Sequence, residues 1–309
     1  MTATDQRPTS TPAPRPAKTG RKRTPRATYR PVGERGFSWW KLGFYAVLIL
    51  VAVIYIYPFV IQIGTAFKTD GDATYNPLNP FPVEPTLRAF EQLGDVDFPL
   101  WFGNTVFVTF FITIGRVLFN SMAGYALSRL QFFGRRFLLV AILAVMAVPG
   151  VVLLIPKFLI LNQLGIYNTY AAMILPLLMD ATGVFIMKQF FDTIPPSLEE
   201  AARIDGAGVI RRFWSVMLPM AVPALITLTV FAFQGSWNEF THMIVARSSA
   251  ETNTLTTGVA ALTTGQFGSG NRYPLKLAAA LIMTIPVAVV YFIFQRKLVR
   301  GQGSGAVKG

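Results

Sequence analysis

The chain has 309 residues, of which 52% are hydrophobic and 14% are charged, and its formal net charge is +13. Its mean hydropathy of +0.46 and its low charge content do not suit an ordinary soluble surface. The chain has no cysteine and one histidine, His242. A disulfide framework, a thiolate nucleophile and a metal site built from cysteine or histidine are therefore excluded.

Residues 1–36 are rich in Pro, Thr, Ala, Arg and Lys and almost lack large apolar side chains. Such a segment buries too little surface to offset the entropy of ordering it. We therefore expect a disordered, basic cytoplasmic tail over residues 1–36. The role we expect for it is contact with anionic lipid headgroups. Residues 37–309 form the membrane domain.

Six apolar segments follow the tail, each close to the roughly 20 residues that cross a hydrocarbon core of about 30 Å. They predict an all-α, polytopic membrane protein with six transmembrane helices: Leu42–Gly64, Asn104–Leu127, Phe137–Leu161, Tyr170–Phe191, Pro219–Val245 and Leu275–Phe294. Prolines inside several segments predict bends, which membrane helices tolerate where neighbouring helices satisfy the freed carbonyl groups: Pro149, Pro156, Pro176, Pro223 and Pro286.

Lysine and arginine in the connections predict the orientation, because cytoplasmic loops carry an excess of them. With six spans, four basic regions fall on one side of the membrane: 21–41, 129–136, 203–212 and 296–308. The connections Thr65–Gly103, Asn162–Thr169 and Arg247–Pro274 fall on the other side. Both termini are therefore expected in the cytoplasm, and the excess of basic residues is explained without nucleic acid.

The connection between the fourth and fifth segments, residues 195–219, has the pattern of a compact helix-turn-helix. Pro195 and Pro196 stop the preceding helix. Ser197 is a suitable N-cap, and Glu200 three residues later completes a capping box. The first short helix is expected to run to about Asp205, where glycines break it.

A second short helix is expected over Ile210–Met217, ahead of Pro219 and the membrane. Gly206 is expected in a turn that needs a positive φ angle or close approach to a partner. The small side chains of Ala201 and Ala202 add little bulk to one side of the first helix. A partner's groove can therefore approach the backbone closely there, as in helix-in-groove recognition.

The residues Glu200-Ala201-Ala202, followed by Gly206 and closed by Leu218-Pro219, resemble the EAA motif of binding-protein-dependent ABC transporter permeases. The stretch 197–207 is similar to the carbohydrate-uptake branch of these permeases, and within it to the MalG-type subunit. Trp237–Phe240 and the C-terminal Gly305–Gly309 agree with that resemblance, which covers roughly Phe37 to Gly309.

The resemblance implies a MetI/MalG-like fold in a bacterial plasma (inner) membrane. It implies that the EAA segment is a coupling helix, which docks in a cleft of a dimer of ATP-binding subunits through these residues: Glu200, Ala201, Ala202, Asp205, Gly206 and Ala207. A second permease subunit completes the pathway, and an extracytoplasmic solute-binding protein delivers a sugar.

The chain has no Gly-x4-Gly-Lys-Ser/Thr loop that would cradle phosphates. We therefore expect a transport subunit that is not an enzyme and holds no cofactor, with ATP and Mg²⁺ bound by the partner. The competing hypothesis is a stand-alone secondary transporter or channel. Paired broken-helix repeats and several mid-membrane acidic groups would support that alternative, and neither is evident. The particular sugar stays open, because fold resemblance does not transfer substrate identity.

Arg116 lies near the middle of the second predicted span, and Asp180 lies inside the fourth. A mid-membrane arginine costs about 2.5–3.5 kcal/mol on insertion scales, so it should face protein or water. Arg116 departs from the apolar or small residue that is usual in the family. Both residues are candidates to line or gate the pathway, alone or as a pair; the alternative is that each snorkels or pairs with another subunit.

Trp237, Asn238, Glu239 and His242 lie near the outer end of the fifth predicted span. An aromatic ring with amide and carboxylate groups suits sugar hydroxyls, so the first three are candidates for substrate contact. The alternative for Trp237 is an anchor at the membrane interface.

Overall fold

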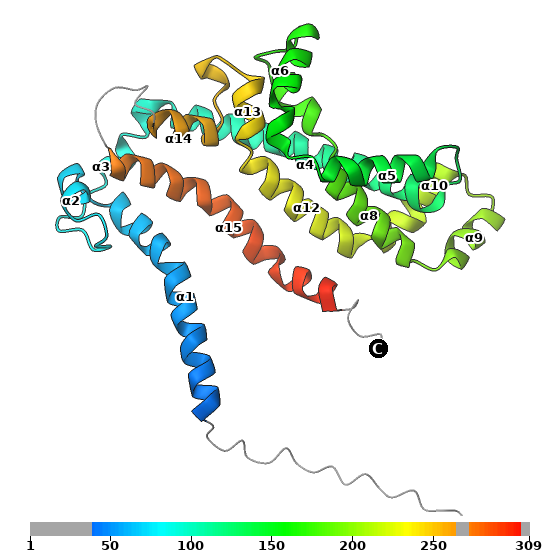
Figure 1. The fold of residues 1–309 in the computed structure, drawn as a ribbon, viewed down its shortest axis with the longest axis horizontal. Coiled ribbons are helices and arrows are strands. Elements are labelled where there is room, and N and C mark those ends of the chain that lie inside the picture. Colours follow the sequence, from blue (N-terminus) through cyan, green and yellow to red (C-terminus); the bar gives the residue numbers. More distant parts are fainter. Residues whose placement is uncertain (1–38, 264–271, 304–309) are drawn as a thin grey trace, which may run out of the picture. The chain divides into compact units, whose positions relative to one another are not determined.

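The computed structural model describes residues 39–263 and 272–303, all of whose regular structure is helical (Figure 1). The predicted tail at residues 1–36 and the C-terminal stretch Gly305–Gly309 lie outside the described residues. Within the described ranges no strand occurs, which confirms the all-α prediction.

The chain divides into two compact units, residues 1–53 and 54–309. The described part of the first unit is the beginning of helix α1, Trp39–Ala66, whose exposed apolar side chains suit a lipid environment. The second unit holds the rest of α1 and the following α-helices: α2 Asp70–Tyr75, α3 Arg88–Glu91, α4 Phe98–Arg129, α5 Arg135–Met146, α6 Leu154–Gln163, α7 Tyr170–Ile174, α8 Ala181–Thr193, α9 Pro196–Ile204, α10 Val209–Arg212, α11 Leu218–Met220, α12 Val222–Trp237, α13 Thr241–Ala246, α14 Leu255–Thr263 and α15 Tyr273–Gly303.

Among the residues that the structure describes, four segments are long and apolar enough to cross a membrane: Trp39–Ala66, Phe98–Arg129, Tyr170–Thr193 and Tyr273–Gln295. Two bent helix pairs raise the number to six if each is one span. The first pair joins Arg135–Met146 to Gly150–Gln163 at 102°, and the second joins Val209–Met220 to Val222–Trp237 at 84°. The six-span prediction is therefore compatible with the helices, provided that two spans are broken rather than straight.

The breaks follow from the backbone chemistry of the sequence. Pro149 stands at the bend of the first pair, where it occupies the N-cap position of the short 3₁₀ turn Gly150–Leu153. In the second pair, the π-helical turn Phe213–Met217 precedes α11 and α12. The predicted fifth span, Pro219–Val245, extends too far, because α12 ends at Trp237 and a separate helix, α13, begins at Thr241.

Helix α4 is the centre of the larger unit, with its most extensive contacts to α8 and then to α12. Three buried apolar clusters lie along it. Trp101 lies in the cluster near its beginning, together with Trp237 and Leu255. Val108 and Ile112 belong to a cluster with α6, α7 and α13. Near the end of α4, Tyr125 packs with residues of α8, the π-helical turn and α12.

The connection from α1 to α4 is held by a buried lysine and an aspartate. The Nζ atom of Lys68 donates to the carbonyl of Asn76 at 2.8 Å, and lies 3.9 Å from Oδ1 of Asp72. The pKa of Asp72 lies below its usual value, mainly because the backbone N–H of Val83 donates to the carboxylate and the Asn76 amide does so too. This loop therefore has a defined structure.

Close packing of α14 on α4 gives a test of this arrangement. A Cβ atom at Gly258 would lie 2.2 Å from the ring of Trp101, which is 1% exposed, whereas a Cβ atom at Gly103 would meet nothing within 4 Å. We expect Gly258→Ala to lower the free energy of unfolding by about 1–3 kcal/mol through overpacking. Gly103→Ala, the matched control within α4, should instead be neutral or stabilising by up to about 1 kcal/mol. Thermal unfolding of both variants in detergent checks this, and equal effects would contradict the packing.

Candidate coupling and pathway sites

The segment 195–219 forms the predicted helix-turn-helix. Helix α9 runs from Pro196 to Ile204, and α10, Val209–Arg212, continues into the π-helical turn Phe213–Met217. The two helices are therefore close to the predicted extents. They are joined by the turn at residues 205–208, which has no helical assignment.

The predicted capping box at the start of α9 is wrong. Pro195 occupies the N-cap position and makes no side-chain cap, while Ser197 lies inside the first turn. Pro196 at the first helical position explains the difference, because its fixed φ angle suits a helix start and its missing N–H needs no cap there. Glu200 is exposed and does not cap the helix.

Gly206 ends α9 in a Schellman motif. Its φ angle is +78°, which only glycine adopts readily. The N–H of Ala207 donates to the carbonyl of Ala202 at 2.9 Å, and the N–H of Gly206 donates to that of Arg203 at 3.1 Å. Of the two alternatives considered for this glycine, the positive φ angle is therefore present, and the turn depends on it.

The other predicted coupling residues lie on the accessible surface of this segment. Glu200, Ala201, Asp205 and Gly206 are exposed, while Ala202 and Ala207 are half-buried. Their backbone and small side chains are therefore open to a partner, as helix-in-groove recognition requires. A role in docking stays a prediction.

Sequence reasoning missed Glu199, whose side chain connects this segment to the membrane helices. Glu199 is only 8% exposed, and the Tyr125 hydroxyl of α4 donates to its Oε1 atom at 2.7 Å. Arg212 Nη1 lies 3.4 Å from Oε1, and Arg129 Nε lies 3.8 Å from Oε2. One signal for this cluster was available: a tyrosine and an arginine four residues apart at the end of α4.

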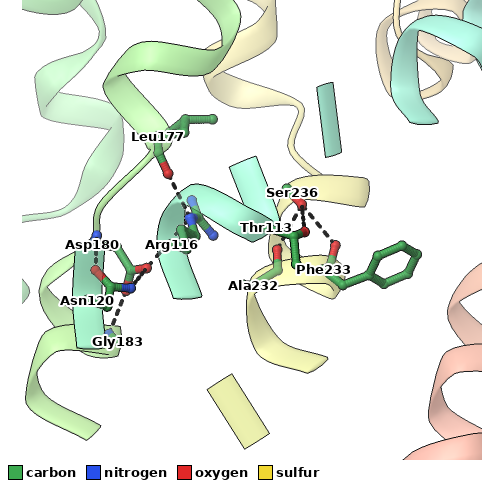
Figure 2. Close-up of polar contacts among 9 residues, drawn as sticks. All are labelled: Thr113, Arg116, Asn120, Leu177, Asp180, Gly183, Ala232, Phe233 and Ser236. Carbon is green, nitrogen blue, oxygen red and sulfur yellow. Dashed lines mark hydrogen bonds and ion pairs between the residues drawn. The ribbon is translucent and has the colours of Figure 1, made fainter. Parts of the chain in front are cut away.

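The mid-membrane residues Arg116 and Asp180 form the pair considered from the sequence (Figure 2). Arg116 Nε lies 3.6 Å from Oδ2 of Asp180, and it donates to the carbonyl of Leu177 at 2.9 Å. Leu177 belongs to a 3₁₀ turn just before α8, so its carbonyl is accessible at the break in the fourth span. The guanidinium group therefore satisfies polar groups that this break leaves in an apolar environment.

Asp180 is also the N-cap of α8. Its Oδ1 accepts from the N–H of Gly183 at 2.7 Å, and its Oδ2 accepts from the Asn120 side-chain amide at 3.0 Å. The Asn120 carbonyl oxygen in turn accepts from the N–H of Asp180 at 3.1 Å (Figure 2). Arg116 and Asn120 of α4 thus bind the beginning of α8, Arg116 through an ion pair with Asp180 and Asn120 through two hydrogen bonds with it.

Two open grooves of about 450 Å³ and 490 Å³ border the other side of α4. Both are mostly apolar, and Thr113 lines both of them. Their remaining hydroxyl-bearing residues are Thr109, Ser121 and Thr229. Neither Arg116 nor Asp180 is among the residues that line these two grooves, so their contacts favour a structural role. A pathway role for either one stays a prediction.

Thr113 also meets α12 directly. Its hydroxyl lies 3.4 Å from that of Ser236, which donates to the carbonyl of Ala232 at 2.8 Å (Figure 2). No sequence pattern indicates this pair, because isolated threonines and serines are common in membrane helices.

Trp237, Asn238 and Glu239 all have partners within the chain. Trp237 is 2% exposed, stacks on Phe233 and donates from Nε1 to the carbonyl of Met283 at 3.0 Å. The Asn238 amide donates to the carbonyl of Gln234, and Glu239 Oε1 accepts from the N–H of His242 at 2.8 Å. These contacts lie where α12 ends and α13 begins. The Trp237 ring therefore packs in the core, where it also lines the second groove, and sugar contact by these three residues stays a prediction.

Comparisons with protein families, with individual relatives and with solved structures agree with one another. Residues 116–303 match the family described as the binding-protein-dependent transport system inner membrane component. The inner membrane ABC transporter permease protein YcjP of Escherichia coli strain K12 is 32% identical over 275 residues, covering 87% of this chain and 97% of that protein.

The sulfoquinovosyl glycerol transport system permease protein SmoH of Agrobacterium fabrum is 34% identical over 276 residues, covering 88% of this chain and 95% of that protein. A solved bacterial ABC transporter involved in the import of the acidic polysaccharide alginate has a chain that is similar with a TM-score of 0.73 and 25% identity, covering 86% of this chain and 99% of that one. These comparisons define a membrane-spanning transport subunit. The chain belongs to the family of binding-protein-dependent transport system inner membrane components.

The chain is therefore a membrane-spanning permease subunit of an ABC importer, and the alternative of a stand-alone transporter or channel is not favoured. It is a transport subunit and not an enzyme, because its family and its relatives are permease subunits of transporters. Membership implies in general terms an inner-membrane location and three kinds of partner: an ATPase, a solute-binding protein and a second permease.

The Arg116–Asp180 pair leads to a prediction by mutant cycle. Arg116→Leu should leave the Asp180 carboxylate without its cation and lower the free energy of unfolding by about 1–3 kcal/mol, less than for a fully buried pair because Asp180 is partly exposed. Adding Asp180→Asn should recover part of this loss, since asparagine keeps the N-cap. Thermal unfolding and uptake of the four proteins measure the coupling, and strictly additive effects would show that the residues do not interact.

Proposed function

We propose that this chain translocates a sugar or an oligosaccharide across the bacterial inner membrane, with residues 195–219 as the coupling segment that docks on a dimer of ATP-binding subunits. The observation that carries the proposal is the exposed helix-turn-helix with Gly206 at a positive φ angle. Partners and substrate follow from the family and from the chemistry of this segment.

The surface of the coupling segment supports docking to a protein partner. Ile204 is 86% exposed and Ile210 is 75% exposed, on either side of the turn at Gly206. A large apolar side chain exposed in the connection between two spans, as Ile204 is, is typical of a protein interface, whereas Ile210 lies at the beginning of the helix pair counted above as one span. Glu200 lies one helical turn before Ile204 and makes no side-chain hydrogen bond or ion pair within the described ranges, so its charge is available to a basic partner residue.

The substrate class rests on the relatives. The names of SmoH and of an arabinooligosaccharide permease of Halalkalibacterium halodurans, AraQ, both refer to carbohydrate substrates. Hydroxyl groups of Thr113, Ser121 and Thr229 along the two grooves are compatible with sugar hydroxyls. The proposal therefore names a carbohydrate, without choosing among particular sugars.

ATP and Mg²⁺ belong to the partner subunit in this proposal, and this chain holds no cofactor. Transport then needs a second permease subunit to complete the pathway and an extracytoplasmic binding protein to deliver the sugar. Both termini and the coupling segment lie in the cytoplasm, in agreement with the arginines at 129–136 and 203–212.

The orientation can be tested because the chain has no cysteine. We expect a single cysteine at Tyr75, which is 85% exposed in α2, to react with a membrane-impermeant maleimide in intact cells. A single cysteine at Ser197, which is exposed in α9, should react only after the cells are permeabilised. Labelling of Ser197 but not of Tyr75 in intact cells would reverse the proposed orientation.

The coupling role predicts a specific defect in Gly206→Val. A β-branched residue at φ +78° is strained by about 1–3 kcal/mol, although a Cβ atom there would meet nothing within 4 Å. We expect the variant to insert into the membrane normally but to lose sugar uptake, because the distorted turn docks poorly on the ATPase. The measurements are the amount of ATPase subunit that co-purifies with the tagged chain and the ATP hydrolysis stimulated by binding protein and sugar.

Gly208→Val is the matched control. Gly208 has φ −65° and also has open space around its Cβ position, so valine adds similar bulk there without backbone strain. Gly208→Val should be impaired less than Gly206→Val. Normal assembly, stimulation and uptake in Gly206→Val would remove the main support for the proposed function.

A further inference from the structure

The carboxylate of Glu199 is the most heavily engaged acidic group of the coupling segment, and it directly precedes the residues Glu200-Ala201-Ala202 that carry the resemblance to the EAA motif. It accepts from Tyr125 at 2.7 Å and lies within 4 Å of both Arg129 and Arg212. The cluster joins three elements, because Tyr125 and Arg129 end α4, Glu199 lies in α9 and Arg212 ends α10. Its neighbour Glu200 is exposed instead.

Arg129 also holds a fourth element, α8, in the same place. Its Nη2 atom donates to the carbonyls of Phe191 and Ile194, at the end of α8. A cation at the C-terminal end of a helix satisfies orphan carbonyls and interacts favourably with the helix dipole. Ser128 adds a hydrogen bond to Asp192 at 2.6 Å. The end of α8 is therefore fastened to the end of α4.

The middle and the beginning of α8 are fastened to α4 as well. A Cβ atom at Gly124 would lie 2.7 Å from the Cβ of Met187 and 2.8 Å from the backbone nitrogen of Lys188, so the two helices are in close contact there. At the beginning of α8, Arg116 and Asn120 hold Asp180 (Figure 2). Helices α4 and α8 are therefore in contact at the beginning, in the middle and at the end of α8.

Helix α9 follows α8 after two residues, and Ile194 before it is buried. The chain holds α9 at both ends, through Ile194-Pro195 to α8 and through the turn at residues 205–208 to α10, while most of its surface is exposed. Glu199 adds an attachment on the helix itself, to side chains of α4 and α10. This attachment restricts rotation of α9 about the line between its two ends, which the chain connections alone do not.

We propose that Glu199 is a positioning residue that fastens α9 to α4 through Tyr125, Arg129 and Arg212, so that α4, α8 and α9 move as one body when a partner displaces α9. The significance of this motion for transport rests on the proposed function. The rigid attachment itself is a property of this chain alone. Displacement at the coupling segment then reaches the break at Asp180 directly, through the two ends of α8.

The attachment is tested by a distance measurement in the full chain. Spin labels at Ser197 in α9 and Met122 in α4, both exposed, are introduced into the cysteine-free chain in lipid nanodiscs. The parent should give one narrow distance distribution by double electron–electron resonance. Glu199→Gln, which removes the charge and keeps the shape, should broaden it about twofold, as expected when a local contact opens.

Tyr125→Phe is the second variant, because it removes only the hydroxyl and keeps the ring packed against Phe191 and Phe213. It should broaden the distribution in the same direction, and the double variant should broaden it by less than the sum of both. Glu251→Gln, the same change at an exposed glutamate far along the chain, is the control and should leave the distribution unchanged. A parent-like distribution in both Glu199→Gln and Tyr125→Phe would overturn the proposal.

The same labels in the complex purified through a tag on this chain, with cysteines of the partners replaced, test transmission. Addition of ATP and Mg²⁺ should leave the Ser197–Met122 distance of the parent unchanged, since the elements move together, and should shift it in Glu199→Gln. A shift in the parent would show that α9 moves independently of α4 and would refute the inference. Failure of an ATPase subunit to co-purify would instead contradict the proposed function, while the measurement on the chain alone still decides the attachment.

Discussion

The close packing of α4 on α8 is the interaction on which the larger unit depends. It requires glycines, because a Cβ atom at Gly124 or Gly183 would lie within 3 Å of atoms of the facing helix. It also gathers polar groups of α4 on the side that faces α8, among them Arg116, Asn120, Ser128 and Arg129. An apolar solvent enforces this sorting, since polar groups at membrane depth need partners inside the protein. The other side of α4 carries apolar and hydroxyl-bearing residues, which line the two grooves.

Irregular backbone appears where such partners exist. The fourth span is interrupted near Asp180, and the carbonyl that the interruption frees at Leu177 accepts a hydrogen bond from Arg116. The mid-membrane arginine is thus explained by the break, and the break is stabilised by the arginine. A charged group inside a span is therefore not by itself a sign of a substrate pathway: here its contacts belong to the fold, and its cost is offset by an adjacent carboxylate.

The coupling segment combines a rigid base with an open surface. Glu199 turns toward the ends of α4 and α10, while Glu200 and Ile204 remain exposed on α9. Two adjacent glutamates with opposite environments are an ordinary consequence of helical geometry, because neighbouring residues point about 100° apart. In a subunit that must respond to a partner, this division lets one residue hold the helix and the next contact the partner.

The sequence by itself determined the helical class, the approximate spans, the approximate extent of α9, and a glycine turn after it at Gly206. These features depend on local chemistry: hydrophobic length, proline and the conformational freedom of glycine. It also paired Arg116 with Asp180 as a possibility, because two opposite charges in one apolar layer have few other partners. Only the tertiary structure decided that Pro195 stands where a Ser197 cap was expected, that Glu199 rather than Glu200 is buried, and that Trp237 packs in the core. Those outcomes depend on the rotation of each helix about its axis and on where a span ends, and both are set by contacts between residues far apart in the chain, which a linear pattern does not contain.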